Sequence, residues 1–291
     1  MEFVDLDDGQ HSEHHWTRGE CQYGILPANG LVYSPPDPCQ CYNFMKVDGF
    51  ASMSHRSSLD SASPESPGER LLKGPAYGTG DDGDSQRTVP EPADEGDLWS
   101  TGGLDSGADG DWPTYRHDMA RSGSTDAAVS AELERAWEAD LGGELTPAVA
   151  SEGRILVAAE KKGVLYCLDA ENGDRLWQFT ADGPIDSPPT IRGSTAYLGS
   201  RSGHVYALRL SDGRLRWRFR AAPVDRRLVS RDRLESVWPV RGTVLFLDGA
   251  VYFAAGRSSH LDGGLRLFAL RADTGELLHR IFAAEAVPAV H

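Results

Sequence analysis

A hairpin-like pattern that recurs three times in the C-terminal half constrains the fold more than any other feature of the sequence. The copies are Gly163–Trp177, His204–Trp217 and Leu265–His279. Each copy reads as an apolar run, a polar turn that contains a glycine, and a second run that ends at a tryptophan or a histidine. In the first copy the turn contains Asn172 and Gly173, two residue types that tolerate the positive φ of a tight hairpin. Each copy is therefore predicted to form a pair of antiparallel strands.

The spacing of these copies predicts the architecture. Trp137, Trp177 and Trp217 follow one another at equal intervals, and His279 follows Trp217 after a longer one. The equal interval is about 40 residues, and such a period, with four short strands per unit, is typical of propeller blades. We therefore predict an all-β fold, a partial β-propeller of about four consecutive four-stranded antiparallel blades. Within 111–291 the predicted units are 143–182, 183–222, 223–283 and the start of a further unit at 284–291, with the additional length of the third unit in a charged loop at 223–235.

The recurring pattern resembles the tryptophan-docking motif A-x-D-x-x-T-G-x-x-x-W of bacterial propellers of the pyrroloquinoline-quinone (quinoprotein) type. Arg209 and Arg271 depart from it at the aspartate position, and His279 departs at the third tryptophan. The stretch 111–123 also looks like the entry segment of quinoprotein-like repeat proteins, including relatives of the outer-membrane assembly lipoprotein. The resemblance implies that each tryptophan wedges between neighbouring blades. It assigns structural docking roles to Trp137, Cys167, Asp169, Gly173, Trp177, Ala207, Gly213, Trp217, Ala269 and Gly275.

The N-terminal part of the chain differs in charge from the repeats. Residues 1–110 contain 20 acidic and 6 basic side chains, whereas 111–291 contain 24 and 23. We predict a degenerate propeller unit at 20–53. The tail at 1–19 and the acidic linker at 54–110 are predicted to be disordered, because polar segments with few apolar residues cannot offset the entropy of ordering. The fourth strand of the degenerate unit is assigned to Glu134–Asp140.

The composition of the chain argues against several kinds of partner and of targeting segment. The near-neutral repeats present no basic face, which argues against nucleic acid as a partner. No apolar run of about 18 residues is present, so no transmembrane segment is predicted. A basic region followed by an apolar core is also absent from the start of the chain, and no signal peptide is visible there.

Three of the four cysteines lie in the degenerate unit. Cys21, Cys39 and Cys41 lack the C-x-x-C spacing of a metal site, and no metal ligand is assigned. Two interpretations of them stay open: a disulfide from Cys21 to Cys39 or Cys41, and free thiols. Cys167 is expected to stay free in its docking position.

A loop in the third unit contains the residue types of a catalytic triad in consecutive positions. A triad needs its members to converge from different elements, which Ser259, His260 and Asp262 of one loop rarely do. No catalytic residue is therefore assigned. Arg257, His260 and Asp262 instead either organise the turn of their own loop or face a ligand, and they form the candidate ligand loop because loops on a rigid scaffold commonly carry binding residues.

Two functions remain as hypotheses. The first is a non-catalytic propeller repeat module, a binding or scaffolding domain within a larger bacterial protein of the periplasm or cell surface. Its partners would be other proteins or further domains of the same polypeptide, and no cofactor is predicted. The alternative is a quinoprotein dehydrogenase that uses pyrroloquinoline quinone and calcium. The dehydrogenases that the repeats resemble use an adjacent pair of cysteines, which this sequence lacks.

Overall fold

The computed structural model describes the repeats almost completely and parts of the N-terminal half. The described residues are 2–4, 7, 9–13, 24–28, 31–34, 51–54, 70–79, 110–230, 233–259, 262 and 264–283. Their regular structure consists of strands, β1 to β20, which confirms the predicted all-β class. Within these residues no helix is long and apolar enough to cross a membrane.

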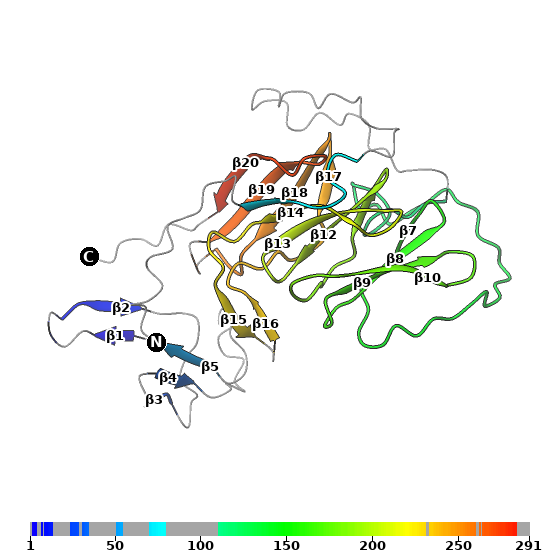
Figure 1. Ribbon diagram of the computed structural model, residues 1–291. Helices are drawn as coiled ribbons and strands as arrows, with labels where there is room; N and C mark the ends of the chain where they lie inside the picture. The colour runs from blue at the N-terminus through cyan, green and yellow to red at the C-terminus, as the bar shows by residue number, and fades with distance from the viewer. Residues whose placement is uncertain are drawn as a thin grey trace.

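Three four-stranded antiparallel blades follow one another along the chain (Figure 1). Blade one contains β7 (Val149–Ser151), β8 (Arg154–Ala159), β9 (Val164–Asp169) and β10 (Arg175–Thr180). Blade two contains β11 (Thr190–Arg192), β12 (Thr195–Ser200), β13 (His204–Arg209) and β14 (Leu215–Arg220). Blade three contains β17 (Leu245–Leu247), β18 (Ala250–Ala255), β19 (Leu265–Arg271) and β20 (Leu277–Ala283). All twelve strands fall inside the ranges predicted for their units.

The blades pack face to face, with their first strands towards one another. The first strand of blade two, β11, contacts both β7 and β17. Every residue of β12 is buried and β13 is almost fully buried, since blade two is covered on both faces by its neighbours. One apolar core fills the space between blades one and two, and a second fills the space between blades two and three. Stability in such an array comes from contacts between nearest neighbours.

The insertion in the third unit forms a hairpin where we predicted a loop. Strands β15 (Arg227–Ser230) and β16 (Arg233–Ser236) pair with each other in a separate two-stranded sheet. The prediction was wrong because charge dominated our interpretation of 223–235. The alternation of exposed and more buried side chains along β15 is the strand signal that the charge concealed.

The predicted acidic linker contains an ordered segment. Strand β6 (Leu71–Lys73) joins the outer edge of blade two as a fifth strand, in the order β11-β12-β13-β14-β6 (Figure 1). The expectation of disorder across 54–110 is therefore wrong for residues 70–79. Composition averaged over the whole segment could not detect a stretch this short.

The N-terminal part of the chain, as far as Ser54, also contains described strands. A hairpin of β1 (Glu2–Val4) and β2 (His11–Glu13) lies within the tail predicted to be disordered, so that prediction is wrong for these residues. The degenerate unit contributes a three-stranded sheet of β3 (Leu26–Ala28), β4 (Leu31–Ser34) and β5 (Ala51–Ser54). Glu134–Asp140 forms no strand and does not join this sheet, which overturns its assignment as the fourth strand.

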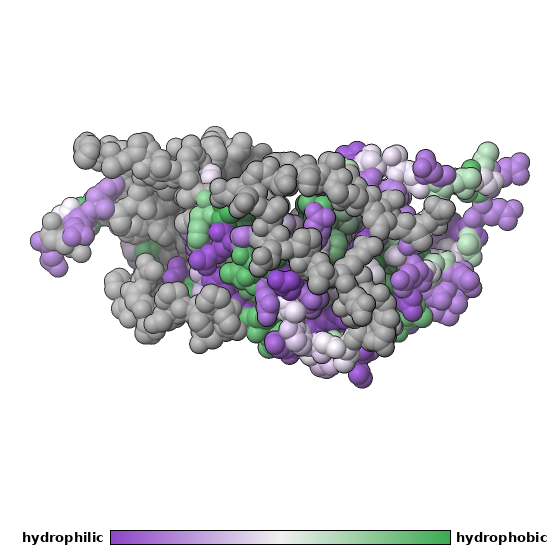
Figure 2. Space-filling view, turned by 90° about the horizontal axis from the view of Figure 1, so that it is seen from above, coloured by the Kyte–Doolittle hydropathy of each residue, from purple (hydrophilic) through white to green (hydrophobic). Residues whose placement is uncertain are grey.

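The described surface mixes polar and apolar residues. Figure 2 shows hydrophilic and hydrophobic residues interspersed on the face seen from above. Single exposed apolar residues are ordinary on a protein surface.

Candidate functional site

The three tryptophans of the repeat all reach across to the next blade. The indole Nε1 of Trp137 donates to the backbone oxygen of Ala170 at 3.0 Å, although its own segment forms no strand. Trp177 donates to the oxygen of Leu210 and Trp217 to that of Ala272, each at 2.9 Å. Each bond joins the tryptophan of one unit to the turn of the following unit.

Small residues make room for these rings on both sides. Cys167 lies opposite Trp177 in the β9–β10 ladder, and Ala207 lies opposite Trp217 in the β13–β14 ladder. On the neighbouring blade each ring lies against a turn glycine: a Cβ on Gly213 would come within 2.4 Å of the Trp177 ring. The equivalent distances are 2.5 Å from Gly173 to Trp137 and 2.7 Å from Gly275 to Trp217. No side chain fits there, so the indoles have a packing role.

The aspartate position of the motif is filled in two different ways. In blade one, the Asp169 carboxylate accepts the backbone N–H of Glu171 at 2.8 Å and that of Asn172 at 3.2 Å. In blade two, Arg209 donates through Nε to Asp212 of the turn at 2.9 Å. In blade two the strand therefore ends in a positive charge and the carboxylate lies in the turn, and a hydrogen bond still joins the strand end to the turn.

Position 279 differs from the other docking positions. His279 lies opposite Ala269 in the β19–β20 ladder, as the register predicts, and it is exposed. No described turn glycine lies against it.

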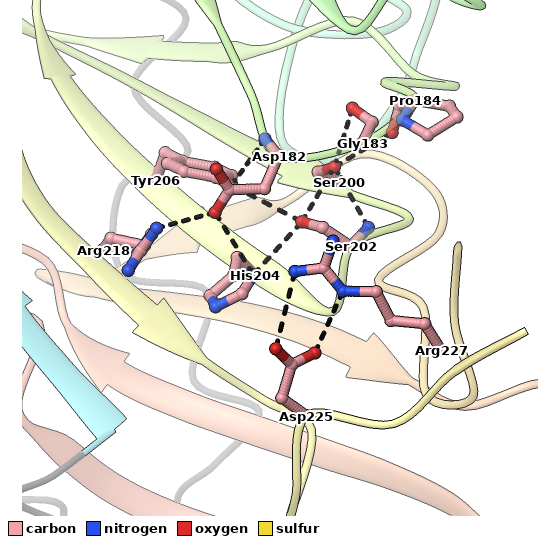
Figure 3. A network of polar contacts seen from close by, with 10 residues as sticks. All are labelled: Asp182, Gly183, Pro184, Ser200, Ser202, His204, Tyr206, Arg218, Asp225 and Arg227. Atoms are coloured by element: carbon pink, nitrogen blue, oxygen red, sulfur yellow. Dashed lines mark hydrogen bonds and ion pairs between the residues drawn. The ribbon is translucent and has the colours of Figure 1, made fainter. Parts of the chain in front are cut away.

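The opposite end of the blades carries a polar network around a buried histidine (Figure 3). His204 is 7% exposed, and its Nδ1 lies 3.1 Å from Ser202 Oγ and 3.9 Å from Asp182 Oδ2. Burial, and next the Arg218 guanidinium, lowers the pKa of His204 to about 4, so the ring is neutral at pH 7. Asp182 is paired with Arg218 at 2.6 Å.

This network has the residue types of a hydrolase triad without its geometry. A triad base uses one ring nitrogen for the serine and the other for the carboxylate. Here Ser202 and Asp182 both approach Nδ1, and Ser202 Oγ is buried and donates to Ser200 Oγ at 3.1 Å. The arrangement therefore stabilises the interface between blades one and two and offers no activated nucleophile.

A buried carboxylate anchors the hairpin of blade three. The Glu235 side chain on β16 is fully buried and bonded to Arg257 Nη2, whose side chain is 2% exposed. Arg241 and Arg201 approach the same carboxylate at 3.6 and 3.8 Å, and Arg201 also pairs with Asp186 at 3.0 Å. Sequence reasoning missed these residues, because they are scattered from Asp186 to Arg257 and share no local spacing.

Two residues of the candidate ligand loop, Arg257 and Asp262, lie in the described part of the chain. Arg257 faces inwards, since it donates to Glu235 and to the backbone oxygen of Ser236. Burial raises the pKa of Asp262 to about 6, and its backbone oxygen accepts the Trp238 indole N–H at 2.9 Å. His260 lies outside the described residues. Of the two roles left open for the loop, the structural one fits Arg257, because its buried side chain positions the hairpin through Glu235.

The hairpin itself presents an apolar pair to solvent. Val229 and Leu234 lie opposite each other in the β15–β16 ladder and are 48% and 55% exposed. Their strands are fixed at three points: Arg233 donates to the Lys161 oxygen of blade one, Ser236 N–H to the Arg201 oxygen of blade two, and Arg257 of blade three to Glu235. We call these strands and their anchors the hairpin end.

Metal and thiol chemistry find little support in the described part of the chain. No group of three His, Cys, Asp or Glu side chains there could hold a metal ion. Cys167 is free and buried, and burial raises its thiol pKa to about 12, which makes it a poor nucleophile. Cys21, Cys39 and Cys41 lie outside the described residues, so both interpretations of them stay predictions.

Comparison with known proteins adds a family match. The model of a family described as outer membrane protein assembly factor BamB matches residues 123–287. The BamB of Burkholderia pseudomallei is 27% identical over 109 residues, covering 37% of this chain and 28% of that protein. The BamB of Escherichia coli is 30% identical over 104 residues, covering 30% of this chain and 26% of that protein. The chain thus spans between a quarter and three tenths of the length of these curated relatives.

The solved structures that this chain resembles include two kinds of protein. The quinohemoprotein alcohol dehydrogenase of Comamonas testosteroni gives a TM-score of 0.46 at 18% identity, covering 59% of this chain and 27% of that one. The BamB of Moraxella catarrhalis gives 0.31 at 19% identity, covering 52% of this chain and 56% of that one.

Proposed function

The family model matches more than half of the chain, so the chain belongs to the family of the outer membrane protein assembly factor BamB. We propose that the chain is a non-catalytic propeller module that binds other proteins. The partners would be separate proteins or further domains of the same polypeptide, and the place of action would be the periplasm or cell surface. The relatives' name, outer membrane protein assembly factor, supports both parts of this proposal.

The hairpin end carries the proposal. Val229 and Leu234 are exposed aliphatic residues that project from the blades on a paired, anchored element. An aliphatic pair of this kind suits an apolar spot on a partner protein, since the centre of a protein interface is apolar. It offers nothing to a small polar substrate.

Rigidity of the hairpin supports the same function. Leu234 directly precedes Glu235, whose carboxylate is held in the interior by Arg257 and is close to Arg241. A surface that is already fixed loses little conformational entropy when a partner binds. The buried ion network thus prepares the apolar pair for binding.

Site-specific photo-crosslinking in the native bacterium tests the proposal. A photoreactive residue at position 229 or 234 of the intact chain should give the same discrete protein adduct. Leu176 on β10 is the matched control, because it is 48% exposed but lies away from the hairpin. The proposal fails if position 176 gives that adduct equally, or if positions 229 and 234 give none.

A quantitative arm uses the partner so identified. Leu234→Asp should weaken its binding to the purified chain at least tenfold while leaving the melting temperature close to that of the wild type, because surface substitutions usually change stability little. Unchanged affinity would remove Leu234 from the interface.

The proposal also includes the absence of a quinone. The purified chain, incubated with pyrroloquinoline quinone and calcium, should retain no quinone absorbance after desalting and should show no dye-linked alcohol oxidation above a heat-denatured control. Retained quinone with such activity would return the dehydrogenase hypothesis.

A further inference from the structure

The fifth strand on blade two is added to a fold whose other described blades have four. Leu71, Leu72 and Lys73 of β6 lie opposite Phe219, Arg218 and Trp217 of β14. The backbone continues the pairing beyond the strand, with Gly74 N–H donating to the Arg216 oxygen at 2.8 Å and Ala76 N–H to the Leu215 oxygen at 2.9 Å. We call residues 70–79 the strap.

Close approach of the two backbones selects small residues in the strap. A Cβ on Gly74 would lie 2.2 Å from the Leu215 backbone oxygen and 2.8 Å from its Cβ. Because the obstacle is mostly backbone, it cannot move aside like a flexible side chain. Ala76, two residues later, is completely buried. The edge therefore accepts glycine at the first of these positions and a small residue at the second.

Larger side chains of the strap enter the seam between blades two and three. Leu71 and Tyr77 pack against the apolar core that contains Trp217 and Phe219. Leu71 also lies over the turn of blade three, where its Cδ1 would be 2.7 Å from a Cβ on Gly275. Leu72 points the other way and is 45% exposed. This alternation between the two faces is that of a bound strand.

Two arginines of blade two hold the far end of the strap. Arg209 donates to the Thr79 hydroxyl at 3.2 Å, and Arg216 donates to the Thr79 backbone oxygen at 3.3 Å. The contacts thus extend from position 71 to position 79 and combine backbone pairing with side-chain selection.

We propose that the outer edge of blade two is a peptide-binding edge that accepts an extended segment of another polypeptide by strand addition, with the strap as its intramolecular ligand. The segment would carry the pattern of the strap: leucine, then glycine three residues later, alanine five later and an aromatic residue six later. Backbone bonds give affinity in this mode of recognition and side-chain pockets give specificity. This edge belongs to a different sheet from the hairpin strands, and the inference does not depend on the function proposed for the hairpin end.

Exchange of the strap for a second segment is physically reasonable. A three-residue ladder is short, and an intramolecular ligand needs less intrinsic affinity than a free one, because tethering raises its effective concentration at the edge. A segment with the same pattern on a partner protein could therefore compete when it is held nearby.

The test uses an open-edge variant of the full chain, in which residues 71–77 are replaced by glycine and serine without a change of length. A fluorescein-labelled peptide of residues 69–80 should bind this variant saturably in fluorescence anisotropy, at least tenfold more tightly than it binds the wild-type chain. The same peptide with Gly74→Val should bind at least tenfold more weakly. The matched control peptide with Leu72→Ser should bind within threefold of the original.

A second variant covers the case in which the open-edge chain does not fold. Gly74→Val alone in the full chain should displace the strap and likewise raise affinity for the wild-type peptide at least tenfold over that of the wild-type chain. The proposal is overturned if neither variant binds the peptide saturably, or if the Gly74→Val peptide binds as tightly as the original.

Discussion

The two junctions between the blades use the same tryptophan contact but differ in what surrounds it. At both junctions an indole donates to a backbone oxygen of the next blade at 2.9 Å and lies on a turn glycine. Trp217, between blades two and three, is completely buried, whereas Trp177, between blades one and two, is partly exposed. The strap packs against the apolar core that contains Trp217, whereas no described strand is added beside Trp177 at the edge of blade one.

This difference shows that a repeated motif does not imply a repeated energy. Junction two–three adds three mutually contacting phenylalanines, Phe219, Phe253 and Phe268. Junction one–two has the buried polar network of His204 instead. The local motif determines where the blades meet, and residues distant in sequence determine how strongly.

Truncation of the two tryptophans should give the largest difference. Trp217→Ala should lower the free energy of unfolding by about 3–5 kcal/mol, as removal of a fully buried large aromatic does. Trp177→Ala should cost about 1–2 kcal/mol less, because part of its ring is already in water. Urea denaturation of both variants measures this. Equal losses would mean that the strap contributes nothing to junction two–three.

Acid should weaken junction one–two specifically. The pKa of His204 is about 4 in the fold and 6.5 when unperturbed. Between these values the unfolded chain binds a proton that the native site excludes, so stability falls as the pH falls, by about 2–3 kcal/mol between pH 7.5 and 4.5.

His204→Gln is the control for this pH dependence, since it removes the titrating group and keeps a polar side chain. The raised pKa of Asp262 acts in the opposite direction, but it is present in both proteins and cancels in the comparison. Identical pH profiles of unfolding for wild type and variant would contradict the assignment.

What the sequence could predict follows the same division between local and distant contacts. The strands around Cys167 and Trp177 were predictable because apolar alternation, a turn glycine and the regular spacing of the tryptophans are all visible in the sequence itself. Glu235, Arg257 and Arg201 were not, since their pairing depends on three different elements meeting in space. A charged residue in a charged loop gives no sign that it will be buried.

The strap escaped prediction for a related reason. Leu71, Gly74 and Ala76 have little β-strand propensity of their own. Their ordered conformation comes from pairing with the edge of β14, which is remote from them in the sequence. Disorder inferred from average composition fails where a short segment finds a preformed edge.

Loosening the strap should reduce the difference between the junctions. Gly74→Val should cost about 1–3 kcal/mol, the usual range for a side chain forced into a packed site. In that background, Trp217→Ala should cost about 1 kcal/mol less than in the wild type, whereas the cost of Trp177→Ala should not change. Thermal or urea unfolding of this double-mutant cycle measures the coupling. A zero coupling energy at Trp217 would show that the strap and the indole are energetically independent.

The smallest effect is expected where the motif has lost its tryptophan. His279 lies opposite Ala269, in the position that Trp177 and Trp217 occupy in their own blades. No described turn glycine lies against position 279, so the contact that makes Trp217 valuable has no counterpart there. In urea denaturation, His279→Trp should therefore raise the free energy of unfolding by no more than about 0.5 kcal/mol, the usual range for a surface substitution. A gain several times larger would show that an indole stabilises a blade without a described turn glycine against its ring, and the comparison of the two junctions would then need another cause.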